Sequence, residues 1–222
     1  MTPAPVRAPF SATDAIGYGW NAFTANVGPL AVIGLVVVLA SGLSNWLSRG
    51  YDNAFISLAG AVLGAFISLV IGLGLIRAAL RILDGGRPSA EDVVSTQDIG
   101  PYILASLMVA LIVSVGFILC IVPGLIAGYL LQFYGYAIID RKADSVTTAP
   151  QSTPTGALRA SFEVAANNVG PLILLAVLCF LLNFAGLLLC IVGLLVTVPV
   201  TAIAVAYAWR YFSGGRIAQI VR

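Results

Sequence analysis

Two amide side chains are the residues best equipped for binding chemistry inside the long apolar stretches of this sequence. Gln132 and Asn183 lie among aliphatic and aromatic neighbours, where an amide must find a hydrogen-bonding partner or bind a polar group of a substrate. No charged residue accompanies them at depth, as coupling to protons or ions normally requires. We interpret them first as interhelical hydrogen-bonding groups and second as a candidate intramembrane site of a permease for an apolar or lipid substrate.

Catalytic and metal-binding groups are scarce. The sequence has no histidine, and Cys120, Cys179 and Cys190 all lie in apolar runs without metal-ligand spacing. No nucleophile stands beside an acid or base that would activate it. We therefore expect no enzymatic activity, no metal and no cofactor. Free cysteines are favoured over a disulfide between Cys120 and Cys190, because both neighbourhoods are apolar.

The composition is typical of an integral membrane protein. Hydrophobic residues make up 60% of the chain and charged residues 9%, and the mean hydropathy is +1.03. A soluble domain carries about 25% charged residues. The net charge of +2 is too small to indicate a nucleic-acid partner. The polar residues that follow Arg7 do not fit a cleavable signal, so the first span is expected to act as an uncleaved anchor.

The uncharged stretches predict six membrane-spanning helices. The first two are expected at about 29–48 and 54–76. The stretch 99–139 would extend roughly 60 Å as a helix, enough for two crossings with a turn at 122–124. The stretch 164–209 provides two more, with a turn near 192–193. The six spans form three hairpins.

A repeated Gly-Pro pair divides the chain into units of about 70 residues. Before the first pair, Ile16, Trp20, Phe23 and Val27 form one apolar helical face, which is expected to lie in the headgroup plane. Glycine is expected to end this elbow helix in the left-handed conformation, and proline to open the next helix. The predicted corners are Gly28 and Pro29, Gly100 and Pro101, and Gly170 and Pro171.

The predicted fold is therefore an all-α integral membrane protein of three repeats, each with an amphipathic elbow helix, a Gly-Pro corner and a helical hairpin. A single membrane domain covers the chain. Its parts are the N-terminus 1–10, the repeats 11–87, 88–142 and 153–212, the loop 143–152 and the tail 213–222.

The basic residues predict the orientation. All Lys and Arg residues except Arg49 fall on one side of the six-span arrangement, among them Arg77, Arg81 and Arg87. By the positive-inside rule, this side and both termini are cytoplasmic in a bacterial plasma membrane. These three arginines are interpreted as a solvated inner face that fixes the topology, and second as a docking site for lipid phosphates or a partner.

Four segments resemble a known family: 15–30, 74–89, 98–125 and 157–172. They are similar to uncharacterised polytopic membrane proteins of high-GC Gram-positive bacteria, related to YciC-like and glycerophosphoryl diester phosphodiesterase membrane-domain proteins. The resemblance covers nearly the whole chain. It implies the fold and a membrane location, without the catalytic domain of the phosphodiesterase relatives and without an established reaction.

Two functions remain open from the sequence. One is a non-enzymatic membrane-organising protein or accessory subunit, with the lipid bilayer and other membrane subunits as partners. The other is a small permease or lipid-handling protein with a cavity among the three hairpins. A polar cavity that contains Gln132 or Asn183 would favour the second.

Overall fold

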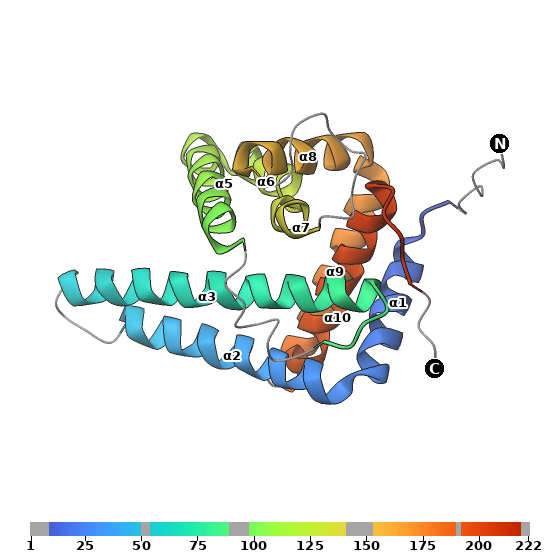
Figure 1. Cartoon of the computed structure of the whole chain (residues 1–222). Helices are drawn as coiled ribbons and strands as arrows, with labels where there is room; N and C mark the ends of the chain where they lie inside the picture. Colours follow the sequence, from blue (N-terminus) through green and yellow to red (C-terminus); the bar gives the residue numbers. More distant parts are fainter. Residues whose placement is uncertain (1–8, 50–53, 89–97, 141–152, 190–191, 219–222) are drawn as a thin grey trace.

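The computed structural model describes residues 9–49, 54–88, 98–140, 153–189 and 192–218, and this part of the chain is helical without a strand (Figure 1). The predicted second elbow, the loop 143–152 and Cys190 lie outside these residues. The helices are α1 (Ala12–Ala25), α2 (Val27–Arg49), α3 (Ala54–Leu83), α5 (Ile99–Leu119), α6 (Ile121–Leu130), α7 (Tyr134–Ile139), α8 (Pro154–Asn167), α9 (Val169–Leu188) and α10 (Val192–Phe212).

Five segments in the described part are long and apolar enough to cross a bilayer, which indicates a multi-pass membrane protein. The first expected span, at about 29–48, falls in α2, which is a helix of 23 residues. Among its described residues Val27–Val36 forms an apolar stretch, and the crossing of the membrane by this helix stays a prediction. The five segments are Ser57–Leu83, Ile99–Leu119, Ile121–Ile139, Val169–Leu188 and Gly193–Phe212.

The corners between elbow helices and hairpins lie two residues before the Gly-Pro pairs. Asn26 ends α1 and Asn168 ends α8, and each amide Nδ2 donates to the carbonyl four residues earlier, at 3.1 and 2.9 Å. At the second corner Asp98 has a φ of 59°. Asparagine amides therefore satisfy carbonyls that a left-handed glycine would have satisfied.

The structure thus corrects the expectation that left-handed glycines form these corners. Gly28, Gly100 and Gly170 are the second residues of their helices, and a Cβ on any of them would meet nothing within 4 Å. In the described chain, positive φ among glycines occurs at Gly85 and Gly214 instead. Pro29, Pro101 and Pro171 are third residues of their helices, where the backbone N–H has no helical partner and proline costs little.

The turn of the second hairpin also lies earlier than predicted. Cys120, with extended backbone, separates α5 from α6, so Pro123 stands in the first turn of α6 instead of in the turn. Gly116 and Gly124 allow the two helices to approach closely, because a Cβ on Gly116 would lie 2.8 Å from Cα of Gly124. Cys120 itself is a free, exposed thiol.

The elbow helices pack on protein through small residues. In α1 the buried positions include Ala15, Gly19 and Ala22, and this helix packs on α10 and α9, while Trp20 is half exposed. The corresponding residues of α8 are Ala157, Ser161 and Val164, which face α7 and its neighbours, while Phe162 is half exposed. The residues expected to form one apolar face of this elbow differ in exposure: Phe23 is buried in the protein, whereas Trp20 and Val27 are about half exposed, and the placement of α1 in the headgroup plane stays a prediction.

Helix α10 is the centre of the fold and contacts α1, α2, α3 and α9. Pro199 lies buried in its middle and has no N–H, so the Leu195 carbonyl loses its helical donor. Two glycines of other helices approach the backbone here. A Cβ on Gly34 of α2 would lie 2.7 Å from the Leu195 oxygen, and one on Gly19 of α1 would lie 2.5 Å from the Val200 oxygen. Small residues therefore let α1 and α2 dock on the proline segment of α10.

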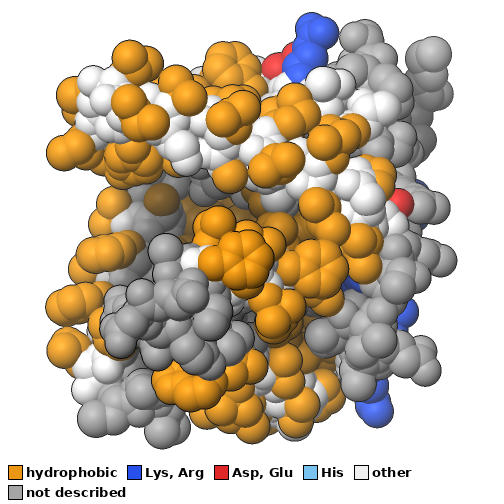
Figure 2. All heavy atoms as spheres, turned by 90° about the vertical axis from the view of Figure 1, so that its left-hand side faces the viewer, with side chains coloured by type: hydrophobic (Ala, Val, Ile, Leu, Met, Phe, Trp, Pro, Cys, Tyr) orange, Lys and Arg blue, Asp and Glu red, His pale blue; other side chains and the backbone are white. Residues whose placement is uncertain are grey.

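The far halves of the hairpins expose large apolar side chains. On α5 the buried residues are Tyr102, Ala105 and Ser106 near its start and Gly116 against α6. Figure 2 shows apolar side chains gathered over much of the described part of this face, with charged side chains at the upper and right-hand edges. The exposed set on this hairpin includes Leu104, Leu107, Leu111, Ile112, Val115, Phe117, Ile118, Leu119, Ile121, Val122, Leu125 and Ile126.

Candidate functional site

A buried ionic cluster joins the ends of three helices that come from the three predicted repeats. The side chain of Arg210, near the end of α10, is only 2% exposed. Its Nε donates to the Asp140 carboxylate, which follows α7 and is fully buried. Its Nη1 donates to Asp84 Oδ1 at 2.7 Å, just after α3, and that carboxylate is 30% exposed. One guanidinium thus links residues that are far apart in the sequence.

Further polar contacts complete this Arg210 cluster. The indole Nε1 of Trp209 donates to Asp140 Oδ2 at 3.2 Å, and Arg210 Nη1 also donates to the Arg216 carbonyl at 3.0 Å. Trp209 also packs on Phe133, with ring centroids 5.9 Å apart. The Arg210 guanidinium and the Trp209 indole therefore both donate to the buried carboxylate, and the cluster holds the segment after α10 against the helix end.

The segment after α10 is tied to two other helices. The Ala218 N–H donates to the Leu83 carbonyl at 2.8 Å, and the Tyr18 hydroxyl of α1 donates to the Ala218 carbonyl at 3.0 Å. Burial raises the pKa of Tyr18 to about 12, and the nearby phenol of Tyr207 adds to this. Tyr18 therefore remains a neutral donor at physiological pH.

The cluster was not singled out by the sequence analysis, although a signal was present. Arg81 and Arg210 both precede a pair of glycines near the end of a spanning helix: Arg81 with Gly85-Gly86, and Arg210 with Gly214-Gly215. The first glycine of each pair has a φ near +80°, and the second lies against the stem of its arginine. The repeated motif places an arginine stem at each helix end. It does not indicate which acidic residues pair with Arg210, because Asp84 and Asp140 are far from it in the sequence.

The predicted amide Gln132 lies in an interruption of a spanning segment. Residues 131–133 separate α6 from α7, and Ser161 of α8 bridges the break: its Oγ accepts from the Phe133 N–H at 3.0 Å and donates to the Leu130 carbonyl at 2.9 Å. The Nε2 atom of Gln132 is buried without a hydrogen-bond partner in the described structure. An interrupted helix is tolerated in a bilayer where protein or water satisfies its backbone.

The second predicted amide, Asn183, lies between α9 and α10. Its Nδ2 donates to the Cys179 carbonyl at 3.0 Å and to Thr201 Oγ1 at 3.3 Å. Its Oδ1 and the Thr197 hydroxyl are buried without hydrogen-bond partners in the described structure. Interhelical bonding thus accounts for the donor of Asn183 but leaves its acceptor unused. No hydrogen bond of the described residues joins Asn183 to Gln132.

The three predicted inner-face arginines lie along the end of α3 and just beyond it. Arg77 is half-buried, whereas Arg81 and Arg87 are exposed. The Arg210 cluster and these residues occupy the same end of the molecule, because Asp84 stands three residues after Arg81, just beyond the end of α3. This end of the molecule therefore gathers several charged side chains.

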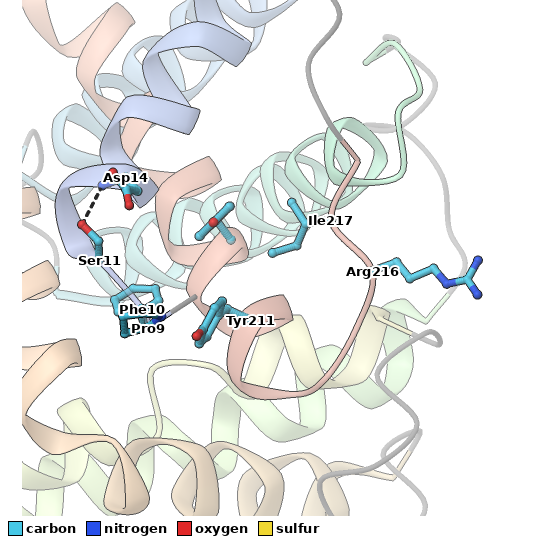
Figure 3. Close-up of a pocket in the computed structure, with 8 residues that line it drawn as sticks. Pro9, Phe10, Ser11, Asp14, Tyr211, Arg216 and Ile217 are labelled. Carbon is cyan, nitrogen blue, oxygen red and sulfur yellow. Dashed lines mark hydrogen bonds between the residues drawn. The ribbon is translucent and has the colours of Figure 1, made fainter. Parts of the chain in front are cut away.

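An open pocket of about 470 Å³ lies at the junction between the start of α1 and the end of α10 (Figure 3). Its lining combines aromatic rings with a carboxylate and a hydroxyl. It is lined by Pro9, Phe10, Ser11, Asp14, Tyr207, Tyr211, Arg216 and Ile217. The described residues contain no group of three or more acidic, cysteine or histidine side chains that could hold a metal ion.

Comparison with known proteins finds similarity to uncharacterised mycobacterial proteins. Uncharacterized protein Rv2560 of Mycobacterium tuberculosis is 29% identical over 242 residues, covering 96% of this chain and 72% of the relative. Uncharacterized protein Mb2590 of Mycobacterium bovis gives the same identity and coverage. No family model and no solved structure matches. The relation to YciC-like proteins stays a prediction, and the relatives' names assign no activity.

Proposed function

We propose that this chain is a non-enzymatic integral membrane protein that organises the membrane or serves as an accessory subunit of a larger membrane complex. The observation that carries the proposal is the α5/α6 hairpin. Leu104, Leu107, Leu111, Val115 and Ile118 recur at helical spacing on α5 and are all exposed. Such a surface requires lipid or another membrane protein to cover it, since apolar patches of this extent are rare on soluble monomers.

The contacts of the elbow helices support a ring of three repeats as the architecture. Gly19 and Ser161 each stand nine residues before a corner glycine, and Leu130 and Val200 each stand thirty residues after one. Gly19 packs against the Val200 carbonyl, and Ser161 bonds the Leu130 carbonyl. Each of these elbows therefore meets the same backbone position in the hairpin of another repeat: α1 on the third hairpin and α8 on the second.

The orientation proposed for this ring is cytoplasmic for the Arg210 cluster and for both termini, in a bacterial plasma membrane. Its support is the collection of Arg77, Arg81, Arg87 and Arg210 at one end of the spans. The exposed apolar halves of the hairpins then lie toward the outer leaflet.

Photo-crosslinking in the membrane tests the accessory role. A photoreactive amino acid at exposed Leu111 is expected to give a discrete adduct with another membrane protein, while the same group at buried Ala105 serves as the matched control. Purification of the chain in mild detergent should recover the same partner. Recovery of the chain alone, with only lipid adducts at Leu111, would contradict the accessory role.

A small permease or lipid-handling protein is the second candidate, favoured by the polar atoms without partners at Gln132, Asn183 and Thr197. Interrupted helices near such groups form binding sites in many transporters. In a cysteine-free background, cysteine placed at 132 or 183 would react with a water-soluble maleimide if an aqueous cavity reaches it. Protection at both positions, with labelling at exposed position 120, would contradict this candidate.

A further inference from the structure

The pocket at the α1/α10 junction lies at the level where a spanning helix leaves the membrane. The span Gly193–Phe212 ends beside it, and the Phe10 ring packs on Phe212 with centroids 4.8 Å apart. A pocket next to the last residue of a span of this length faces the headgroup layer and not the hydrocarbon core. Its ligands are therefore expected to be polar headgroups or solutes at the membrane surface.

Aromatic rings form the wall of this pocket. Phe10 lies 5.2 Å from Tyr211 in an edge-on arrangement and 6.5 Å from Tyr207, and the two tyrosines are one turn apart on α10. All three residues are half-buried, so their rings are held in place while remaining accessible from the pocket. The face of an aromatic ring at such a site offers a weakly negative surface to a cation.

Asp14 supplies a full negative charge to the same pocket. Its backbone N–H donates to Ser11 Oγ at 3.3 Å, so the helix cap uses the main chain and leaves the carboxylate available. Asp14 has no ion pair within the described structure. Figure 3 shows Phe10, Pro9 and Tyr211 grouped near Ser11 and Asp14, whereas the Arg216 side chain extends away from them.

We infer that this pocket binds an ammonium group, of the kind carried by an aminophospholipid headgroup or by a free organic amine. A carboxylate beside aromatic rings matches the charge and the apolar surface of such a cation. A single carboxylate is a poor site for a hard metal cation, which takes six or more oxygen ligands. The volume of about 470 Å³ accommodates a headgroup-sized ligand.

The inference is tested with the full chain purified in mild detergent. Binding of phosphatidylethanolamine and phosphatidylglycerol is compared by native mass spectrometry, and binding of ethanolamine and tetramethylammonium by equilibrium dialysis. Asp14→Asn keeps the backbone cap and removes the charge, so we expect ammonium binding to weaken about fivefold. Tyr211→Leu should weaken it similarly, while Tyr211→Phe, which keeps the ring, should change it less than about twofold.

Matched controls make the outcome decisive. Glu163→Gln removes a carboxylate from the other elbow helix, α8, and should leave ammonium binding unchanged. Selective loss of phosphatidylethanolamine in Asp14→Asn supports a lipid headgroup as the ligand, and loss confined to the soluble amines supports a free cation. Equal binding of every probe to the parent chain and to Asp14→Asn, at unchanged thermal stability, overturns the inference.

Discussion

Replacing Arg210 by methionine should be among the most destabilising single changes in the chain. The substitution keeps an unbranched apolar stem but takes the guanidinium partner away from the Asp140 carboxylate, which is fully buried and also accepts from the Trp209 indole. Removing one partner of a buried ion pair typically costs about 3–5 kcal/mol, because the remaining charge is not compensated. Asp84 is 30% exposed and can be hydrated, so it adds little to this cost.

The measurement is the free energy of unfolding in mixed micelles, followed by tryptophan fluorescence and circular dichroism. Asp140→Asn should cost about 1–3 kcal/mol, since Arg210 keeps Asp84. The double variant Arg210→Met with Asp140→Asn should be more stable than the sum of the single effects by about 1–3 kcal/mol. Such a coupling energy would show that the loss of stability comes from the Arg210–Asp140 ion pair and not from a general packing defect.

The Arg159–Glu163 pair provides the control of the same residue class. It is an i,i+4 pair at 2.9 Å on α8, with the arginine side chain 63% exposed, so Arg159→Met should cost only about 0.5 kcal/mol. If Arg210→Met lay within about 1 kcal/mol of Arg159→Met, the reasoning that burial makes this cluster a structural clamp would be refuted.

Three further changes test the packing and the titration. The variant Gly170→Ala should retain the topology and expression level of the parent chain, because a Cβ at this position meets nothing within 4 Å. Loss of membrane insertion in a topology assay would instead indicate that Gly170 needs a left-handed conformation. The variant Gly19→Ala should lower the free energy of unfolding by about 1–3 kcal/mol, because its Cβ would clash with the Val200 backbone. The control Gly17→Ala should leave it unchanged, because that position has open space. Equal thermal stability of the two variants would contradict the close approach of Gly19 to α10. Tyr18, with its pKa raised from 10.0 to about 12, should stabilise the fold below pH 10 and lose that contribution as the pH rises through 12. The measurement is the difference in phenolate absorbance between the parent chain and Tyr18→Phe as the pH is raised. A midpoint near pH 10 for this difference would rule the prediction out.

The membrane class and most of the spans could be predicted because they depend on local composition. An uncharged stretch such as 99–139 has few alternatives once its length is compared with the bilayer, and it forms α5, α6 and α7 as a hairpin. The corners before the hairpins were predicted within two residues of their observed positions, but the Gly-Pro pairs do not themselves form the bend. Gly-Pro marks a boundary, but the bend is made by Asn26 and Asn168, whose short amides reach their own helix carbonyls.

The Arg210 cluster could not be predicted from local pattern. Its acidic members follow α3 and α7, and each resembles an ordinary charged residue at the end of a span. Their meeting with Arg210 depends on how three hairpins pack, which neither periodicity nor spacing specifies. The amides Gln132 and Asn183 show the opposite case: their depth was evident from the sequence, whereas their unused polar atoms became apparent only from the packed helices.

The distribution of small residues and backbone breaks explains why the two ends of the hairpins differ. The second helix of the second hairpin is interrupted at 131–133, and that of the third contains Pro199, so both present carbonyls that lack normal helical donors. Ser161 bonds the Leu130 carbonyl at the first break, and Gly34 approaches the Leu195 carbonyl at the second, because neither has a bulky side chain. The close packing this permits, together with the Arg210 cluster, fixes one end of the hairpins. The exposed apolar faces at the other end then remain available to lipid or to a partner. A crosslinker at Leu111 therefore tests what covers this exposed surface, and a substitution at Arg210 tests the buried cluster that holds the opposite end together.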